Sequence, residues 1–309
     1  MGHHPPPALK ALPLLFLVAL ALPAGLAQQS AGTAGWLENL HLTAAGTVST
    51  VDNISRTSYA PTRKDAETYE FSLASTHARQ LAPNLLLIAT GEAASLTVAE
   101  YDLTNNLRAA GRIVLQTKFG LGPQATVLQV NTAATYKAAR FDADRGWTTE
   151  AGVQLAKRVW PNLRLAASAS WLEHDARNAL FDLNQHSYTA EAQWDINDRW
   201  TLSGSASRLS GDIVANAAWP VWATMLAGGF GPAIFDYYTS RPWSVTNLYG
   251  PGWVSYNVEG DVDLWAVSLG YAFSDRTSLE LRRNGAYIVN RVGVTYPTSS
   301  WGLSLTHRF

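Results

Sequence analysis

The end of the chain, residues 299–309, alternates strictly between apolar side chains and small or polar ones. The apolar parity carries Trp301, Leu303, Leu305 and Phe309, with His307 as its polar member. Side chains of a β-strand point alternately to its two faces, so this period of two predicts a strand with one apolar face. An exposed strand that ended on an aromatic residue would invite aggregation in a soluble protein. The pattern therefore argues against an edge strand of a soluble protein.

The start of the chain has the organisation of a secretory signal peptide. A lysine precedes an apolar run over residues 11–22, and the small residues Gly25 and Ala27 follow it. A signal peptidase needs such small residues at its cleavage site. A membrane-spanning helix would need about 20 mostly apolar residues, and this run is shorter and flanked by prolines. We therefore expect residues 1–27 to be a signal peptide and residues 28–35 a short lead.

The composition excludes several classes of protein. Hydrophobic residues make up 47% of the chain and charged residues only 15%, against about a quarter in soluble domains. The net charge of −1 gives no reason to expect a nucleic-acid partner, and the absence of cysteine excludes disulfides and a lipid-anchored cysteine. No apolar run after the signal peptide approaches the length of a membrane helix. A chain of this kind fits a transmembrane β-barrel, in which every second residue of a strand faces lipid.

Turn signals divide the chain into strands. Five short segments rich in Pro, Gly, Asn or Asp predict tight turns near residues 80–84, 120–124, 158–162, 195–200 and 274–276. Longer polar segments predict loops near residues 52–65, 101–107, 138–146, 173–184, 208–257 and 284–296. Five turns and six loops separate twelve strands over residues 36–309 and place both ends of the barrel domain beside the short turns.

Aromatic residues gather at both ends of the predicted strands. Those expected at the long-loop ends are Tyr69, Tyr136, Trp147, Trp171 and Trp265. Those expected at the short-turn ends are Trp160, Trp194, Trp200, Phe273 and Phe309. Two belts of amphipathic rings are typical of two membrane interfaces. A soluble β-sandwich, the alternative, would not sort its aromatic residues in this way.

These features resemble the outer-membrane β-barrel proteins of Gram-negative bacteria. The last strand of that family typically ends in Phe behind alternating apolar residues and is recognised by the barrel-assembly machinery. The resemblance implies that Trp301, Leu303, Leu305 and Phe309 form an assembly signal, although His307 stands where the family usually has an aromatic residue. It also implies a closed antiparallel transmembrane β-barrel with periplasmic termini, in contact with outer-membrane lipid and lipopolysaccharide. No subfamily is indicated.

The polar parity of the middle strands supplies candidates for a lumen lining or a solute-binding site. These residues are Arg112, Lys118, Gln129, Asn131, Gln154, Arg158, Arg164, Glu191 and Asp195. Small residues near 201–207 and 266–272 form the facing wall. We expect mixed-sign contacts among the charges of residues 158–195, with Arg164 to Asp195 or Glu191 as the pairing. Two interpretations stay open, a channel for anionic or saccharide solutes and a lumen filled by its own charges.

The segment 208–257 is the longest predicted loop and is rich in rings. Its candidate aromatic residues are Trp219, Trp222, Phe230, Phe235, Tyr237, Tyr238 and Trp243. Loops of this length are usually functional or disordered, and so many aromatic residues argue against disorder. We expect part of this segment to fold inward and occlude the lumen against the small-residue wall. The alternatives are a saccharide-binding surface and a self-packed cap over the barrel mouth.

No pattern in the sequence rises to a catalytic, metal or cofactor site. Outer-membrane phospholipases have a His followed two residues later by a Ser on a lipid-facing strand. Here His186 and Ser187 are adjacent and fall on opposite faces, whereas Ser75 and His77 share a face in the reverse order. The hypothesis is therefore a porin-like outer-membrane channel that is not an enzyme and binds no cofactor. A surface adhesin or polysaccharide-export-associated barrel is the alternative, and a lipid-modifying enzyme is less favoured.

Overall fold

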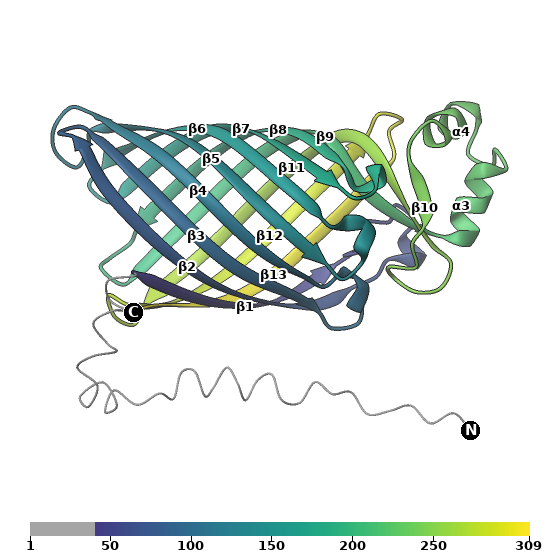
Figure 1. Cartoon of the computed structure of the whole chain (residues 1–309), viewed down its shortest axis with the longest axis horizontal. Coiled ribbons are helices and arrows are strands. Elements are labelled where there is room, and N and C mark those ends of the chain that lie inside the picture. Colours follow the sequence, from purple (N-terminus) through teal and green to yellow (C-terminus); the bar gives the residue numbers. More distant parts are fainter. Residues whose placement is uncertain (1–40) are drawn as a thin grey trace, which may run out of the picture. The chain divides into compact units, whose positions relative to one another are not determined.

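The computed structural model describes residues 41–309 and shows a closed antiparallel β-barrel of twelve strands (Figure 1). The predicted signal peptide and lead, residues 1–35, lie outside the described residues. The barrel strands are β1 (Leu42–Asp52), β2 (Ala66–Ala82), β3 (Leu85–Val98), β4 (Asn106–Phe119), β5 (Thr126–Ala139), β6 (Gly146–Trp160), β7 (Leu163–Ala176), β8 (Leu183–Asp195), β9 (Trp200–Ala218), β11 (Trp253–Ala272), β12 (Thr277–Asn290) and β13 (Thr295–Arg308).

Each barrel strand pairs with its two neighbours, so the barrel has no open edge. β13 pairs with β1, for example at Thr50 and Trp301, and β9 pairs with β11. This confirms the predicted pairing of the last strand with the first. In hydrocarbon an unpaired backbone group has no water to bond, so only a closed sheet can cross a membrane with strands.

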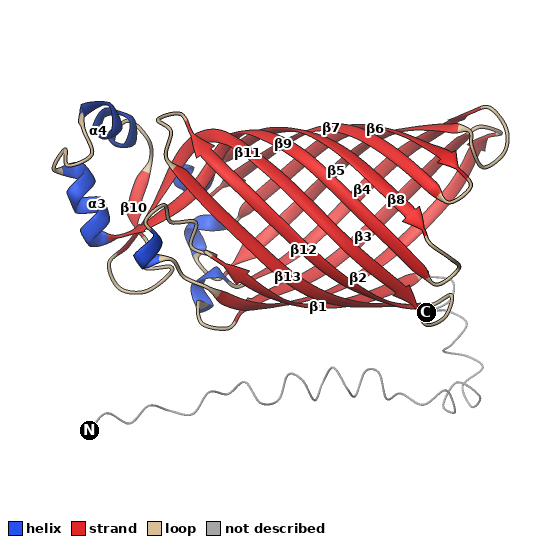
Figure 2. Cartoon of the chain, turned by 180° about the vertical axis from the view of Figure 1, so that it is seen from behind, coloured by secondary structure: helices blue, strands red, loops and turns tan. Residues whose placement is uncertain are grey.

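The two ends of the barrel differ. Tight turns join β2 to β3, β4 to β5, β6 to β7, β8 to β9 and β11 to β12 at one end, where β1 begins and β13 ends. The opposite end carries all the helices of the described residues (Figure 2). These are α3 (Trp219–Leu226), α4 (Pro232–Thr239) and the short 3-10 helices η3 (Ala60–Thr62), η4 (Asp102–Thr104), η5 (Asp142–Asp144) and η6 (Ala179–Phe181). A three-residue strand, β10 (Trp243–Val245), pairs with β11 at that end.

The strands reach further into the predicted loops than the sequence indicated. β9 continues to Ala218 and β11 begins at Trp253, so only residues 219–252 of the predicted loop 208–257 connect them. Similarly, β12 continues to Asn290. The alternation is lost in these extensions because consecutive residues, such as Val254 and Ser255, are both fully buried.

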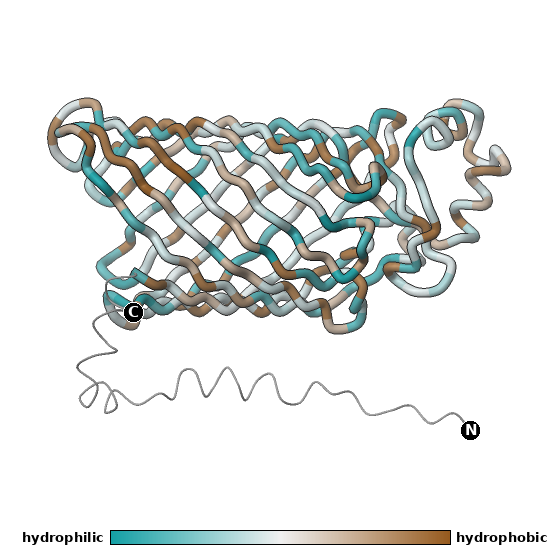
Figure 3. Tube along the Cα trace, in the orientation of Figure 1, coloured by the Kyte–Doolittle hydropathy of each residue, from teal (hydrophilic) through white to brown (hydrophobic). Residues whose placement is uncertain are grey.

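Large apolar side chains cover the outside of the barrel. On β6, Trp147, Val153 and Leu155 are exposed, whereas Glu150 and Gln154 lie on the opposite face. Hydrophobic and hydrophilic residues accordingly alternate along the wall (Figure 3). An apolar outer face around a polar interior is the arrangement that lipid requires of a membrane barrel. No helix of residues 41–309 is long and apolar enough to cross a membrane.

Aromatic residues meet at the strand ends as predicted. Tyr136 and Trp147 lie side by side near the loop end, with ring centroids 5.2 Å apart. Trp200 packs on Tyr271 at the short-turn end, with centroids 4.7 Å apart. His307, in the place of the usual aromatic residue, contacts Phe309 edge to face at 4.8 Å. The imidazole therefore takes part in the ring belt at the end of the last strand.

Gly285 on β12 provides space rather than a bulge. Through Gly285, β12 pairs in continuous register with β11 and with β13. A Cβ atom at Gly285 would overlap the indole of Trp265. That indole and Trp301 flank the outward-facing Arg283, whose guanidinium lies 5.9 and 4.8 Å from the two ring centroids. The cation–π contacts explain how an arginine is accommodated on this face.

We expect Gly285→Ala to destabilise the barrel by about 1–3 kcal/mol, because the added methyl group overpacks the site and displaces Trp265. The measurement is the temperature at which the folded form is lost in heat-modifiability gel electrophoresis. Gly91→Ala on β3 is the matched control, since a Cβ atom there would meet nothing within 4 Å. Equal unfolding temperatures for the two variants would contradict the overpacking argument.

Candidate functional site

The lumen of the barrel is polar, and all the predicted lining residues lie on its inward-facing parity. Register places Gln129 beside Gln116 on β4 and Gln154 on β6, and the amide of Gln129 donates a 2.8 Å hydrogen bond to Gln116 Oε1. The inward-facing candidates are Arg112, Lys118, Gln129, Asn131, Gln154, Arg158, Arg164, Glu191 and Asp195. Their role in binding a solute stays a prediction.

Carboxylates neutralise much of the basic lining. Three ion pairs each join two lumen strands that have one strand between them: Arg108 with Glu70, Arg112 with Glu150 at 3.4 Å and Arg158 with Asp195 at 3.1 Å. The predicted mixed-sign contact near the short-turn end is therefore formed, but by Arg158. The expected pairing of Arg164 was wrong, since within residues 41–309 Arg164 and Glu191 make no ion pair. The β6–β7 register is continuous up to the pair of Arg158 and Arg164, and the bulge between Arg158 and Trp160 lies beyond both arginines.

The predicted small-residue wall of β9 and β11 leaves open space inside the barrel. A cavity of about 220 Å³ lies over Ser203, Ser205, Ala266 and Ser268. A second cavity of about 390 Å³ extends from Ser205 and Ala266 toward the loop end. The two cavities share Ser205, Ala266 and Arg282 among their lining residues, so they lie next to each other along this wall.

Two strands leave the barrel at a pair of glycines. The β8–β9 pairing ends at Gly211 and the β11–β12 pairing begins at Gly260, and these glycines face each other. Gly211 has a φ of +140°, and a side chain at either position would overlap the backbone of the adjacent strand. Beyond them, residues 212–259 form a hairpin with α3, α4 and β10 between its strands. We call residues 212–259 the cap.

One face of the cap hairpin packs against its own helices and against β12 and β13. Trp222 of α3 stacks on Tyr256 with centroids 4.8 Å apart, and both rings are buried. Tyr238 of α4 and Tyr296 of β13 join their hydroxyl groups at 2.6 Å, and the amide of Asn290 donates to Tyr238 at 2.8 Å. These contacts fix the helices to the barrel rim.

The other face of the hairpin contacts loops from around the rim. Tyr249 and Trp253 pack in one cluster with residues of the β1–β2, β3–β4, β5–β6 and β7–β8 loops. The Tyr249 hydroxyl donates to the carbonyl of Ile54 at 3.0 Å, and its ring lies 5.1 Å from that of Tyr101. Tyr249 and Trp253 are therefore in contact with loops from four hairpins, and this part of the cap lies over the loop-end mouth of the barrel.

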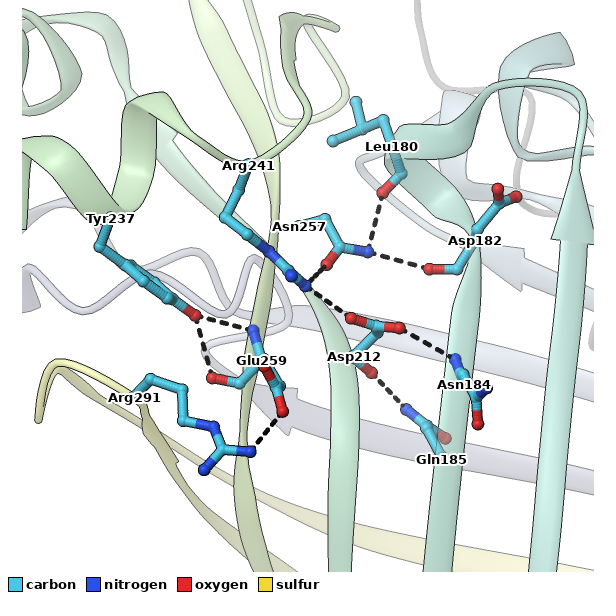
Figure 4. A network of polar contacts seen from close by, with 10 residues as sticks. All are labelled: Leu180, Asp182, Asn184, Gln185, Asp212, Tyr237, Arg241, Asn257, Glu259 and Arg291. Carbon is cyan, nitrogen blue, oxygen red and sulfur yellow. Dashed lines mark hydrogen bonds and ion pairs between the residues drawn. The ribbon is translucent and has the colours of Figure 1, made fainter.

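A polar network holds the cap where it leaves the wall (Figure 4). Arg241, just after α4, donates to Asp212 and to Asn257, each at 2.6 Å. The Asn257 amide donates in turn to the carbonyl of Asp182 at 2.9 Å. Arg241 therefore connects both strands of the cap with the β7–β8 loop. Tyr237 adds a second link, since its hydroxyl accepts from the backbone N–H of Glu259 at 2.8 Å.

The loop aromatic residues divide between packing and exposure. Trp222 and Tyr238 are buried, Phe235 and Tyr237 are partly buried, and Trp219, Phe230 and Trp243 are exposed. No residue of the connection 219–252 lines either of the two cavities. The inward constriction against the small-residue wall is therefore not formed, and the self-packed cap describes the segment. Its key polar residue, Arg241, was missed, although a lone arginine within an aromatic segment was a usable signal.

The candidate catalytic pairs do not assemble into an evident active site. Ser75 Oγ and His77 Nε2 are 3.2 Å apart on the outward parity of β2, near the short-turn end as predicted. His174, which falls within the predicted loop 173–184, is instead buried in β7, where Nδ1 lies 2.8 Å from Thr148 Oγ1. Within residues 41–309 no group of three His, Asp or Glu side chains gathers to hold a metal ion.

A closed barrel with an apolar outside, aromatic ends and a polar lumen is the architecture of outer-membrane β-barrel proteins, and the chain has that fold. An outer membrane channel from Pseudomonas putida F1 is similar, with a TM-score of 0.54, 10% identity, and coverage of 87% of this chain and 96% of the other. The NanC porin is similar with a TM-score of 0.46 and 11% identity, covering 87% of this chain and 100% of the porin. Escherichia coli outer membrane phospholipase A is similar with a TM-score of 0.46 and 11% identity, covering 88% of this chain and 96% of the phospholipase. No protein-family model and no curated protein matches the sequence.

Arg241→Ala is expected to loosen the cap, because Asp212 and Asn257 lose their charged partner in a partly buried site. A hydrogen bond to a charged group contributes about 1.5–3 kcal/mol, so limited proteolysis within residues 219–252 should become roughly tenfold faster or more. Arg208→Ala is the matched control. Arg208 makes ion pairs with Asp261 and Asp263 on the exposed exterior, where such pairs contribute little. Equal cleavage rates in both variants would show that Arg241 does not hold the cap.

The cap should also open at alkaline pH. Burial raises the pKa of Tyr238 to about 12 and that of Tyr249 to about 12, whereas an exposed tyrosine titrates near 10. Between about pH 10 and pH 12 the open cap loses protons that the closed cap keeps, so the stability of the closed state falls as pH rises through that window. Near-ultraviolet circular dichroism should report a reversible loss of aromatic signal there. Below pH 10 the signal should stay constant, and a change centred well below pH 10 would exclude these tyrosines as its cause.

Proposed function

We propose that the protein is an outer-membrane channel for small polar solutes, with the cap closing its loop-end mouth in the structure described. The observation that carries the proposal is the open space of two adjacent cavities along the small-residue wall of β9 and β11. A barrel that served only as a scaffold would gain stability by filling this space with larger side chains, because voids forfeit packing contacts. The open space along this wall supports a path for solutes.

The charges of the lumen bear on which solutes pass. Arg112 and Arg158, two of the predicted basic residues, face Glu150 and Asp195 across 3.4 and 3.1 Å. Such pairing weakens the predicted preference for anions. Serine hydroxyls along the wall can bond to saccharides, but cavities of about 220 and 390 Å³ fit one small solute at a time. We therefore favour small polar solutes over saccharide chains.

A surface-binding role is the second candidate. Trp219, Phe230 and Trp243 of the cap are 45%, 50% and 38% exposed, and exposed rings of this kind are common in binding surfaces. This reading needs no open pore. Removal of the cap therefore separates the two functions.

Replacing residues 212–259 by an Asn-Gly turn between Gly211 and Gly260 should open the mouth. These glycines are paired, and a two-residue Asn-Gly turn is suited to joining paired antiparallel strands. We expect single-channel conductance in planar bilayers to rise several-fold over the full-length protein, since the cap no longer lies over the mouth. Arg208→Ala, which leaves the cap in place, is the control and should conduct like the full-length protein.

A folded variant without the cap that conducts no ions would contradict the channel proposal. The surface-binding role would then take its place. Heat-modifiable migration on gels establishes that the variant has folded as a barrel before the conductance is interpreted.

A further inference from the structure

The cavity near the short-turn end is lined by four charged side chains that have no charged partner. They are Arg164 of β7, Glu191 of β8, and Glu280 and Arg282 of β12. Within residues 41–309 none of the four makes an ion pair, and Arg282 donates only to the neutral side chain of Asn284, at 2.8 Å. The neighbouring pair of Arg158 and Asp195 shows that ion pairs do form in this part of the lumen.

Strand register arranges these charges symmetrically. Arg164, Gln193, Ser203, Ser268 and Arg282 are consecutive partners across β7, β8, β9, β11 and β12. The two arginines therefore end one row, and the amide of Gln193 and the hydroxyl groups of Ser203 and Ser268 lie between them. Four strand spacings of about 4.8 Å separate the arginines along the curved wall.

The two carboxylates lie on either side of that row. Glu191 pairs with Ser205, one step toward the loop end, and Glu280 pairs with Gly270, one step toward the short-turn end. Each flank of the cavity thus offers one cation and one anion, offset along the barrel axis. A solute with a single charge would meet repulsion from half of this set as well as attraction from the other half.

We propose that this cavity binds amphoteric solutes, namely amino acids or short peptides that carry both an ammonium and a carboxylate group. Arg164 and Arg282 receive the carboxylate, since guanidinium groups form two hydrogen bonds with carboxylates. Glu191 and Glu280 receive the ammonium group, and Ser203 and Ser268 replace water between the arginines. A volume of about 220 Å³ suits a solute of this size. The proposal rests on the channel function and names the class of solute.

Glycylglycine, acetate and methylammonium are the probes, because the last two carry one charge each. Saturation-transfer NMR on the full-length protein in detergent measures binding without requiring conduction. We expect glycylglycine to bind up to about fivefold more tightly than either single-charge probe, as one further ion pair near water contributes up to about 1 kcal/mol. Block of the ion current through the variant without the cap should follow the same order.

Paired substitutions that remove charge test the assignment of roles. Glu191→Gln with Glu280→Gln should strengthen acetate binding and remove the preference for glycylglycine over acetate. Arg164→Gln with Arg282→Gln should remove acetate binding and retain methylammonium binding. Glu92→Gln is the control, since this carboxylate of β3 does not line the cavity.

The outcomes separate this inference from the channel proposal. If the variant without the cap conducts but shows no preference among the probes, the amphoteric site is overturned and the channel proposal stands. The same holds if there is a preference but the paired substitutions do not change it. Absence of current in the folded variant without the cap overturns the channel. Absence of binding of all three probes to the full-length protein and to that variant overturns the amphoteric site.

Discussion

The structure depends on the requirement that every backbone N–H and C=O group within a membrane be bonded inside the protein. The last strand meets this requirement by pairing with the first, and β9 meets it by pairing with β11 across a long insertion. Closure fixes one face of each strand toward lipid and the other toward the lumen. The apolar outside, the aromatic ends and the polar interior are consequences of that single constraint.

The same constraint explains how much of the fold the sequence predicts. Lipid and lumen impose opposite demands on alternate residues, so β6 shows Val153 and Leu155 against Glu150 and Gln154. The number of strands, their pairing and the aromatic belts follow from this pattern. At the loop end, where the strands extend beyond the membrane, alternate residues no longer face lipid and lumen. Val254 and Ser255 are both buried by the cap and the loops, so no period of two marks the strand, and the sequence suggests a loop.

The site was less predictable because it depends on contacts between distant segments. The inward parity of Arg158 and Arg164 followed from alternation, but the partner of each did not. Arg158 and Arg164 are paired with each other across β6 and β7, yet only Arg158 reaches Asp195. Arg241 is a stronger example, since its partners Asp212 and Asn257 are brought together only by the pairing of β9 with β11. Short-range patterns do not encode such contacts.

The cap and the lumen are connected through the wall that β9 and β11 share. The same two strands supply the small-residue wall of the cavities and, beyond Gly211 and Gly260, the hairpin of the cap. Inside the barrel, the small side chains of β9 and β11 leave room for a solute. Beyond Gly211 and Gly260, the buried aromatic rings of the cap leave none. Because the β8–β9 and β11–β12 pairings stop at these glycines, the cap continues the barrel wall only through the pairing of β9 with β11, and side-chain contacts such as those of Arg241 attach it to the rim. Loss of those side-chain contacts would leave the backbone bonds of the barrel in lipid intact.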